Sequence, residues 1–283
     1  MPEFANVRSM TIGDTKITYL NDGGGIVKPT VTYPTSDEAG WETYNRFLDD
    51  NGDLIVSIGG FLIEKGDRKI IMDTGFGPMT IEFPGFGPFI GGKYMESFAK
   101  TGVAREDITD VVYTHLHLDH CGWTTVVEDG QRVLSFPNAR HVCTEAEWDF
   151  WDGDESGLGP NPELAQNALR DIVQFIKADD EIAPGITVLD TAGHTPGHIS
   201  LKIDTGAETV YMIADLLHSE VQFYKPEWCV AFDADQAQAR ATREGILDTL
   251  AQSDVIVADG HFADRVFGRL VKDGDSYQWQ AVQ

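Results

Sequence analysis

Residues 115–120 read His115-Leu116-His117-Leu118-Asp119-His120, and most of what the sequence predicts follows from this run. Three of the chain's eight histidines fall within these positions. Imidazole nitrogens and carboxylate oxygens are the ligands that a hydrolytic divalent metal needs. Side chains two positions apart in an extended segment point to the same side, while those beyond a bend can face a second ion. The run therefore predicts a loop that serves two metals.

The residues before the run place it at the end of a buried strand. Asp110-Val111-Val112-Tyr113 is a short β-type segment that leads directly into the histidines. Upstream, residues 11–20, 54–62 and 69–72 are rich in apolar and β-branched residues and predict antiparallel strands of one sheet. Asp73-Thr74-Gly75 follows the last of these strands. The run is thus expected on a loop at the edge of a sheet, where functional residues concentrate.

Residues 76–93 form a loop that is rich in Gly, Pro and Phe. It is too apolar for an ordinary solvated linker, so we expect it to pack over another part of the molecule. An exposed apolar loop of this kind also makes a homodimer plausible.

The second half of the chain repeats the mixture of strands and helices. Apolar residues at helical spacing predict an amphipathic helix over 162–178. Further elements are predicted as strands at 186–189, 198–203, 209–213 and 255–258 and as a helix at 234–251. Two successive passes of strands and helices predict a layered α/β sandwich, and we expect residues 1–283 to form a single domain.

The amino-acid composition disfavours two classes of binding partner. The 283 residues include 46 acidic and 21 basic side chains, a formal charge of −25 that repels phosphate backbones and anionic lipids. Neither nucleic acid nor a membrane is therefore an expected partner. The sequence has no apolar run of membrane-spanning length and no secretory leader pattern, so the expected location is cytoplasmic. Three cysteines without CxxC spacing predict reduced thiols.

The pattern His115-x-His117-x-Asp119-His120 resembles the signature of the metallo-β-lactamase superfamily. The later ligands of that signature also follow in order, as His194, Asp215 and His261, each after a predicted strand. The resemblance implies a four-layer αββα sandwich. It implies one ion held by His115, His117 and His194, a second held by Asp119, His120 and His261, and Asp215 bridging both.

Other polar residues near this pattern carry weaker expectations. Asp73 resembles the family's buried aspartate that braces the metal loop, although Asp-Thr-Gly is also ordinary turn chemistry. His218, three residues after Asp215, is close enough to contact a substrate. His141 and His198 have no place in the ligand pattern, and we interpret His198 as the start of a strand and His141 as a residue on the sheet surface.

A dinuclear site of this kind indicates a hydrolase. Two divalent ions can share a water, lower its pKa to about 7 and present a bridging hydroxide to a carbonyl or phosphoryl centre. Asp119 is the candidate catalytic proton carrier. Zinc is the expected metal, and manganese, iron or cobalt could fill the same ligands. A non-enzymatic metal-binding sensor module would be expected to show eroded ligands, and the complete pattern disfavours it.

The substrate is predicted from a narrower resemblance. Residues 215–223 and 232–235 are similar to the branch of the family that contains quorum-quenching lactonases and methyl parathion hydrolase. The tyrosine that well-known lactonases place just after the bridging aspartate is absent, because Leu216 and Leu217 stand there. Candidate substrate-binding residues are Phe86, Phe89, Trp123, His218 and Phe223.

These features predict a small-molecule hydrolase whose substrate is a neutral, apolar lactone of the acyl-homoserine-lactone type. Arylester or phosphotriester hydrolysis is expected as a side activity. The alternatives are an organophosphate hydrolase of the methyl parathion type and, less favoured by the sequence, a thioesterase or β-lactamase.

Overall fold

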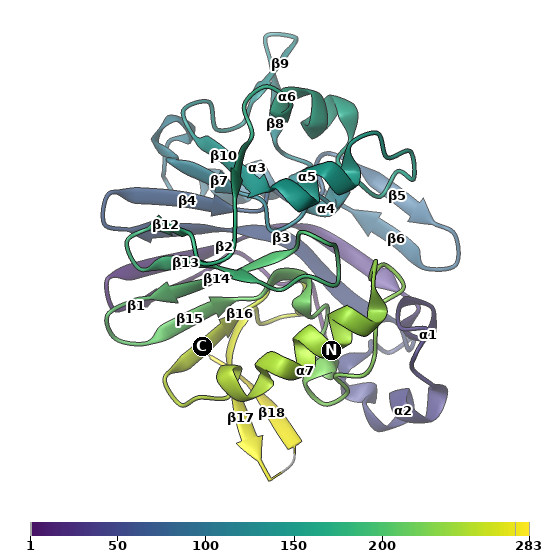
Figure 1. Cartoon of the computed structure of the whole chain (residues 1–283). Coiled ribbons are helices and arrows are strands. Elements are labelled where there is room, and N and C mark those ends of the chain that lie inside the picture. The colour runs from purple at the N-terminus through teal and green to yellow at the C-terminus, as the bar shows by residue number, and fades with distance from the viewer. Residues whose placement is uncertain (1, 275, 283) are drawn as a thin grey trace.

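Two β-sheets, one from each half of the chain, carry the fold in the computed structural model, which describes residues 2–274 and 276–282 (Figure 1). The first sheet has the order β11-β10-β7-β4-β3-β2-β6-β5, with β1 paired to β2. Its strands are β1 Arg8–Ile12, β2 Thr15–Val27, β3 Leu54–Lys65, β4 Arg68–Met72, β5 Thr80–Phe83, β6 Gly87–Ile90, β7 Asp110–Val112, β10 Arg140–Thr144 and β11 Gln174–Ile176. The predicted strands of the N-terminal half are therefore confirmed.

The second sheet runs in chain order from β12 to β18. Its strands are β12 Glu181–Ala183, β13 Ile186–Asp190, β14 Ile199–Asp204, β15 Thr209–Met212, β16 Val255–Ala258, β17 Phe267–Asp273 and β18 Ser276–Ala281. A separate hairpin consists of β8 Thr125–Glu128 and β9 Gln131–Leu134. In the second sheet only β15 and β16 pair in parallel among the described strands, because the long helix α7 crosses over between them.

Alternating side chains pack the two sheets against each other. In β14, Ile199, Leu201 and Ile203 point into the core between the sheets, while the intervening residues face the other way. In β4, Ile70 and Met72 join the same core, and Ile71 belongs to a cluster on the opposite face of its sheet. The period of two that predicts a strand is thus also what builds the central apolar layer.

Helices cover the two outer faces. Side chains of α3 Tyr94–Ala99, α5 Glu145–Trp151 and α6 Asn167–Leu169 pack on the first sheet, and α7 Gln236–Leu250 packs on the second. The remaining helices are α1 Pro29–Thr32, α2 Glu38–Thr43, α4 Leu118–Cys121, the 3-10 helices η1 Asn45–Phe47, η2 Arg105–Asp107, η4 Ala214–Leu216 and η5 Glu220–Phe223, and the π-helix η3 Pro162–Gln166. The expected αββα sandwich is confirmed. No helix within residues 2–274 and 276–282 is long and apolar enough to cross a membrane.

The helix predicted over 162–178 is wrong in its second half. Helical structure ends with α6 at Leu169, and residues 174–176 form β11, which pairs in parallel with β10. The free edge of β10 offers hydrogen bonds to this segment, and Ile176 gains burial in the core between the sheets. Tertiary pairing therefore overrides the helical spacing of the apolar residues.

Residues 76–93, expected as a loop, contain the β5–β6 hairpin. β6 pairs with β2, so that Gly25 lies opposite Phe89. A Cβ on Gly25 would lie 2.7 Å from the Phe89 ring, so the missing side chain is what lets the aromatic ring lie on β2. The expectation that this segment packs over another part of the molecule is confirmed.

We expect Leu201→Ala to lower the free energy of unfolding by about 2–5 kcal/mol, because it opens a cavity in the core between the sheets. Leu201 is fully buried, whereas the adjacent Lys202 is exposed and faces the other way. Lys202→Ala should change stability by less than about 0.5 kcal/mol. Urea denaturation of both variants measures the difference, and equal effects would contradict the assignment of this core.

Candidate metal centre

The ligand residues predicted from the sequence converge at one edge of the sandwich. Residues 115–120 follow β7 of the first sheet, and His194 lies between β13 and β14 of the second. Asp215 follows β15 and His261 follows β16. Because β15 and β16 are parallel neighbours, the residues that follow them emerge at the same edge. Segments nearly 150 residues apart therefore meet in one place.

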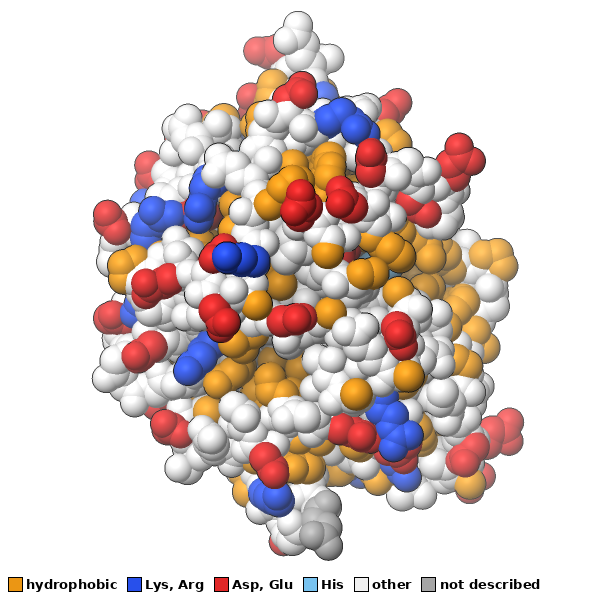
Figure 2. Space-filling view, in the orientation of Figure 1, with side chains coloured by type: hydrophobic (Ala, Val, Ile, Leu, Met, Phe, Trp, Pro, Cys, Tyr) orange, Lys and Arg blue, Asp and Glu red, His pale blue; other side chains and the backbone are white. Residues whose placement is uncertain are grey.

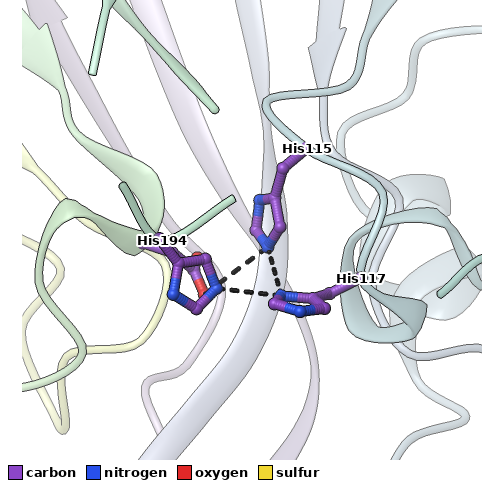
Figure 3. A group of neighbouring side chains, drawn as sticks. His115, His117 and His194 are labelled. Carbon is purple, nitrogen blue, oxygen red and sulfur yellow. Dashed lines mark hydrogen bonds and ion pairs between the residues drawn. The ribbon is translucent and has the colours of Figure 1, made fainter. Parts of the chain in front are cut away.

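His115, His117 and His194 form the first group of nitrogen atoms (Figure 3). His117 Nδ1 lies 2.9 Å from His115 Nε2 and 2.8 Å from His194 Nε2. His194 reaches toward the other two rings from the opposite side, out of the second sheet. The edges of a tetrahedron of zinc ligands are about 3.3 Å for metal–nitrogen bonds of about 2.0 Å, so the spacing suits a single small cation.

Asp119, His120 and His261 form the second group. His120 Nε2 lies 3.2 Å from His261 Nε2, and Asp119 Oδ2 lies 3.7 Å from His120 Nε2 and 4.0 Å from His261 Nε2. The two imidazoles are buried, while Asp119 is partly exposed. This second group is thus open on the side of its carboxylate.

Asp215 lies between the two groups and presents one oxygen to each. Its Oδ1 is 3.0 Å from His261 Nε2 and 3.1 Å from His120 Nε2. Its Oδ2 is 3.2 Å from His194 Nε2 and 3.7 Å from His115 Nε2. A carboxylate in this position can bridge two cations.

Four of the rings have an acceptor at the outward nitrogen, which leaves the inward nitrogen available to a metal. His120 Nδ1 contacts Asp73 Oδ2 at 2.9 Å and His194 Nδ1 contacts Asp233 Oδ1 at 2.9 Å. His261 Nδ1 contacts the Ser57 carbonyl at 2.8 Å, and His115 Nδ1 contacts the Thr114 hydroxyl at 3.1 Å. An N–H that donates outward leaves an unprotonated nitrogen inside, as metal coordination requires. The donor set therefore fits two divalent cations.

The electrostatics of the centre also favour cations. Burial lowers the pKa of His115 well below its usual value, so that this ring is neutral. Burial lowers the pKa of His194 and His261 too, but the Asp215 carboxylate outweighs it and raises both to about 9. Against the cost of burial, the surrounding imidazoles hold the pKa of Asp215 well below its usual range. Metal binding would displace protons from His194 and His261.

A family model for the metallo-beta-lactamase superfamily matches residues 60–261, a segment that includes all of these groups. The chain belongs to the metallo-β-lactamase superfamily. The resemblance inferred from the histidine pattern is thereby confirmed.

Known members of the superfamily resemble the chain over most of its length. An N-acyl homoserine lactonase from Bacillus sp is 26% identical over 214 residues, 71% of this chain and 79% of that protein. The structure of AidC, a dizinc quorum-quenching lactonase with a bound product, matches with a TM-score of 0.83 at 25% identity over 99% of this chain and 98% of that one. The hydrolase AbOPH matches with a TM-score of 0.80 at 28% identity over 99% of both chains. The protein is therefore a metal-dependent hydrolase.

In this metallo-β-lactamase site, Asp73 contacts the residue before the 115–120 run and one ring of the second group, which supports the bracing role expected from the resemblance. Its Oδ1 accepts the Thr114 backbone N–H at 2.8 Å, and its Oδ2 accepts the Thr114 hydroxyl at 2.8 Å and faces His120 Nδ1. Asp73 itself adopts a positive φ of 60° and is buried. One carboxylate thus fixes the start of the loop and orients a ring of the second group.

Two buried carboxylates near the first group were missed from the sequence. Asp233 orients His194, and the fully buried Arg243 lies 3.8 Å from its other oxygen. Glu147 Oε1 accepts the Leu116 backbone N–H at 2.9 Å, and Glu147 Oε2 accepts the Thr195 hydroxyl at 2.6 Å, so this carboxylate ties the His115–His117 loop to the His194 loop. Asp233 lies in the 232–235 stretch, where the resemblance gave it no role, and Glu147 belongs to no motif, since each acts only through the tertiary fold.

His198 and His141, which lie outside the ligand pattern, have structural roles. His198 Nε2 accepts the Asp215 backbone N–H at 3.1 Å, and its Nδ1 contacts Thr191, so this ring supports the segment that carries Asp215. The expectation that His141 lies on the sheet surface is wrong. It is 1% exposed and contacts the Tyr113 hydroxyl, because α5 and the 136–139 turn cover that face.

A largely apolar cavity opens beside the ligands. Its walls are formed by Val27, Thr32, Val56, Phe76, Phe83, Phe89, His117, Leu118, Asp119, Leu158, His194, Asp215, His218, Phe232 and His261. Hydrophobic side chains gather on the side of the molecule where β5 and β6 lie, while acidic side chains are scattered over the rest of the face shown (Figure 2). The entrance side of the site is thus apolar on a strongly acidic protein.

The predicted substrate-binding residues divide into two sets. Phe89 and His218 line the cavity, and Phe86 packs on the lining residue Phe232 with ring centroids 4.9 Å apart. Trp123 and Phe223 do not line the cavity, which corrects the prediction that they bind substrate. The Trp123 indole N–H donates to Asp22, and Phe223 is buried in a cluster behind the second sheet, stacked on Trp279. Aromatic residues in a sequence do not reveal which of them serve the core.

We expect Asp73→Asn and Asp233→Asn each to weaken binding of one of two metal ions by about 10–100-fold, because a neutral amide is a poorer acceptor for the orienting imidazole N–H. Metal per chain, measured after dialysis against a graded series of chelator concentrations, should fall from two toward one in either variant. The exposed Asp152→Asn serves as the control and should retain two. Two ions in all three proteins at every chelator concentration would contradict the orienting role.

Proposed function

We propose that the protein hydrolyses a neutral, apolar lactone of the acyl-homoserine-lactone type at a dinuclear metal centre. The observation that carries the proposal is the apolar cavity that opens directly on the ligand cluster. None of the described residues that line it is Lys or Arg, so it offers no cationic partner for an anionic substrate. The similarity to an N-acyl homoserine lactonase and to AidC supports the same substrate class.

The metal ligands follow from the two groups of donor atoms. His115, His117 and His194 would hold one ion, Asp119, His120 and His261 the other, and Asp215 would bind both. A set dominated by neutral imidazoles suits zinc, and manganese, iron or cobalt could be bound by the same donors. When bound, two such ions supply activation of a water and polarisation of the substrate carbonyl.

The chain's own residues bind and orient the substrate. Val27, Val56 and Phe89 are apolar residues of the cavity wall, and Phe232, on the segment before α7, packs on Phe86 of the β5–β6 hairpin. An acyl chain that lies along these walls loses contact with water, and its burial stabilises the complex by about 25 cal/mol per Å² of apolar surface. The lactone ring at the head of such a chain would then lie over Asp215 and His218, where the polar groups of the cavity are concentrated.

Asp119 is the candidate proton carrier of the reaction. Opening a lactone adds water to the carbonyl carbon, breaks the ring C–O bond and leaves an oxygen that must take up one proton. The Asp119 side chain is 21% exposed and lines the cavity, whereas Asp215 is 4% exposed and surrounded by imidazoles. Of these two carboxylates, Asp119 is therefore the one that can pass a proton from the attacking water to the leaving oxygen.

His218 occupies the place from which a substrate oxygen could be contacted. Its Nε2 lies 3.0 Å from Asp215 Oδ2, and its ring stacks on His261 with centroids 5.4 Å apart. The His218 backbone N–H donates to Gln222 Oε1 at 2.7 Å, which fixes the segment. Burial lowers the pKa of His218, which favours the neutral ring with a single N–H. On Nε2 this N–H faces Asp215, and it would become available to a substrate oxygen once Asp215 binds metal. It can supply the carbonyl contact for which the expected tyrosine is missing.

Arylesters and phosphotriesters are the second candidate substrates. The T-shaped pair Phe83–Phe89, with centroids 5.4 Å apart, and the pair Phe86–Phe232 place aromatic faces at and beside the cavity. Such faces suit an aryl leaving group, and a phosphotriester is neutral like a lactone. Hydrolysis of organophosphates of the methyl parathion type is therefore proposed as a side activity.

A pH-indicator panel tests the substrate class. We expect metal-loaded protein to open N-acyl homoserine lactones fastest, to hydrolyse aryl esters and methyl parathion more slowly, and to leave β-lactams and thioesters essentially untouched. Protein dialysed against chelator is the control and should be inactive until metal is restored. Turnover of thioesters or β-lactams without turnover of any lactone would reject the proposal.

We expect His218→Ala to lower kcat for a lactone by about 100-fold, as loss of one donor to a developing oxyanion does. His218→Gln, which keeps a side-chain N–H, should recover part of this loss. Both variants should retain the metal content of the unmodified protein, which elemental analysis checks. An unchanged kcat in His218→Ala would show that the ring makes no contact with the reacting group.

A further inference from the structure

Asp22 is a fully buried carboxylate in the middle of β2, remote in sequence from the metal ligands. The pairing of β2 with β3 shifts register between Asn21 and Gly23, so Asp22 has no partner residue in β3. This bulge is what turns the Asp22 side chain away from the regular ladder, as bulges at functional sites do.

Six N–H groups point at this one carboxylate. Its Oδ1 accepts from the backbone of Gly92, Lys93 and Tyr94 at 2.8 Å each and from Trp123 Nε1 at 3.0 Å. Its Oδ2 accepts from the backbone of Phe76 at 2.7 Å and of Gly77 at 3.0 Å. Within the described part of the chain no Lys or Arg forms an ion pair with it, so these donors are what stabilise the buried charge.

Four of the six donors lie at the two ends of one segment, the β5–β6 hairpin of residues 76–93. Phe76 and Gly77 begin it, and Gly92 and Lys93 end it. A Cβ on Gly75 would lie 2.7 Å from Asp22 Oδ2, so the backbone approaches the carboxylate as closely as glycine allows. One side chain thus closes the hairpin at its base.

The hairpin carries the aromatic wall of the metal cavity. Phe76, Phe83 and Phe89 all line it. The base also touches the metal loop, since the Gly122 backbone N–H donates to the Gly75 carbonyl at 2.7 Å, two residues after His120. Trp123, the indole donor to Asp22, follows next in the chain. The carboxylate therefore connects the wall of the cavity to the loop that holds the metals.

We propose that Asp22 is a positioning residue that sets selectivity for substrate length by fixing the 76–93 hairpin over the metal centre. The selectivity part rests on the proposed lactonase function. Asp22 touches neither the ligand cluster nor the cavity, so its effect on substrates passes entirely through the placement of Phe76, Phe83 and Phe89.

Asp22→Asn is the sharpest test, because it keeps the size of the side chain but replaces one acceptor oxygen by an NH₂ group. In either orientation that NH₂ faces backbone N–H groups that now lack an acceptor. We expect KM for N-decanoyl-homoserine lactone to rise about 10-fold or more, KM for N-butanoyl-homoserine lactone to change less than about 3-fold, and the metal content to stay at two per chain. A KM that rises equally for both lactones, or for neither, would overturn the selectivity role.

Hydrogen exchange of the backbone amides tests the anchoring without any substrate. In Asp22→Asn the amides of residues 76, 77 and 92–94 should exchange at least 10-fold faster, while those of β14 keep their protection. Unchanged protection of these amides would overturn the proposal even if no lactone is hydrolysed. Faster exchange in a protein that opens no lactone would instead reject the proposed function and leave Asp22 as the anchor.

Two further variants separate anchoring from general loss of stability. Trp123→Phe removes one of the six donors and should shift exchange and KM in the same direction but less, and it carries the test if Asp22→Asn does not fold. Asp110→Asn removes another fully buried carboxylate of the same sheet. Asp110 lies on β7 and pairs with Arg68 and Arg140. This variant should lower stability without changing hairpin exchange or length selectivity, and the opposite result would overturn the proposal.

Discussion

The carboxylate of Asp215 is the group on which the rest of the structure depends. It lies buried among imidazoles that come from both sheets, and one of its oxygens faces each ligand group. A buried carboxylate among buried imidazoles is costly unless the charges are paired, and two cations in the centre of this cluster would balance it. The packing of the two sheets against each other is therefore a condition for the chemistry, because each ligand group needs donors from both.

Rigid orientation of the ligands comes from a surrounding layer of carboxylates. Asp73, Asp233 and Glu147 each hold a ring or a ligand loop, and all three are buried. Arg243, itself fully buried, donates to the carbonyls of Leu216 and Trp228 and faces Asp233, so it links α7 and the segment after Asp215 to the orientation of His194. Carboxylates that bind imidazole N–H groups make the rings better ligands as well as fixing them.

The sequence reveals the parts of this site whose residues are close together in the chain or belong to an ordered pattern. The run from His115 to His120 indicates metal binding by itself, and His194, Asp215 and His261 can be found because each follows a strand that its β-branched residues predict. Glu147 and Asp22 could not be found in this way. Most of their partners are backbone N–H groups and side chains of distant segments, and no local pattern of residues records such contacts. The failed helix at 162–178 has the same origin, since residues 174–176 become a strand only because β10 offers a free edge.

Metal chemistry and substrate choice are carried by different parts of the fold. The ligands stand on the ends of strands from both sheets, where a change would disturb either the charge balance around Asp215 or the packing of the core. The aromatic wall stands on a hairpin whose outer strand β5 pairs only with β6 among the described strands, and whose base is held by the single carboxylate of Asp22. The hairpin supplies lining residues of the cavity but none of the candidate ligands. The cavity wall and the ligand cluster therefore belong to separate parts of the fold, which is why the ligands alone predict the reaction better than they predict the substrate.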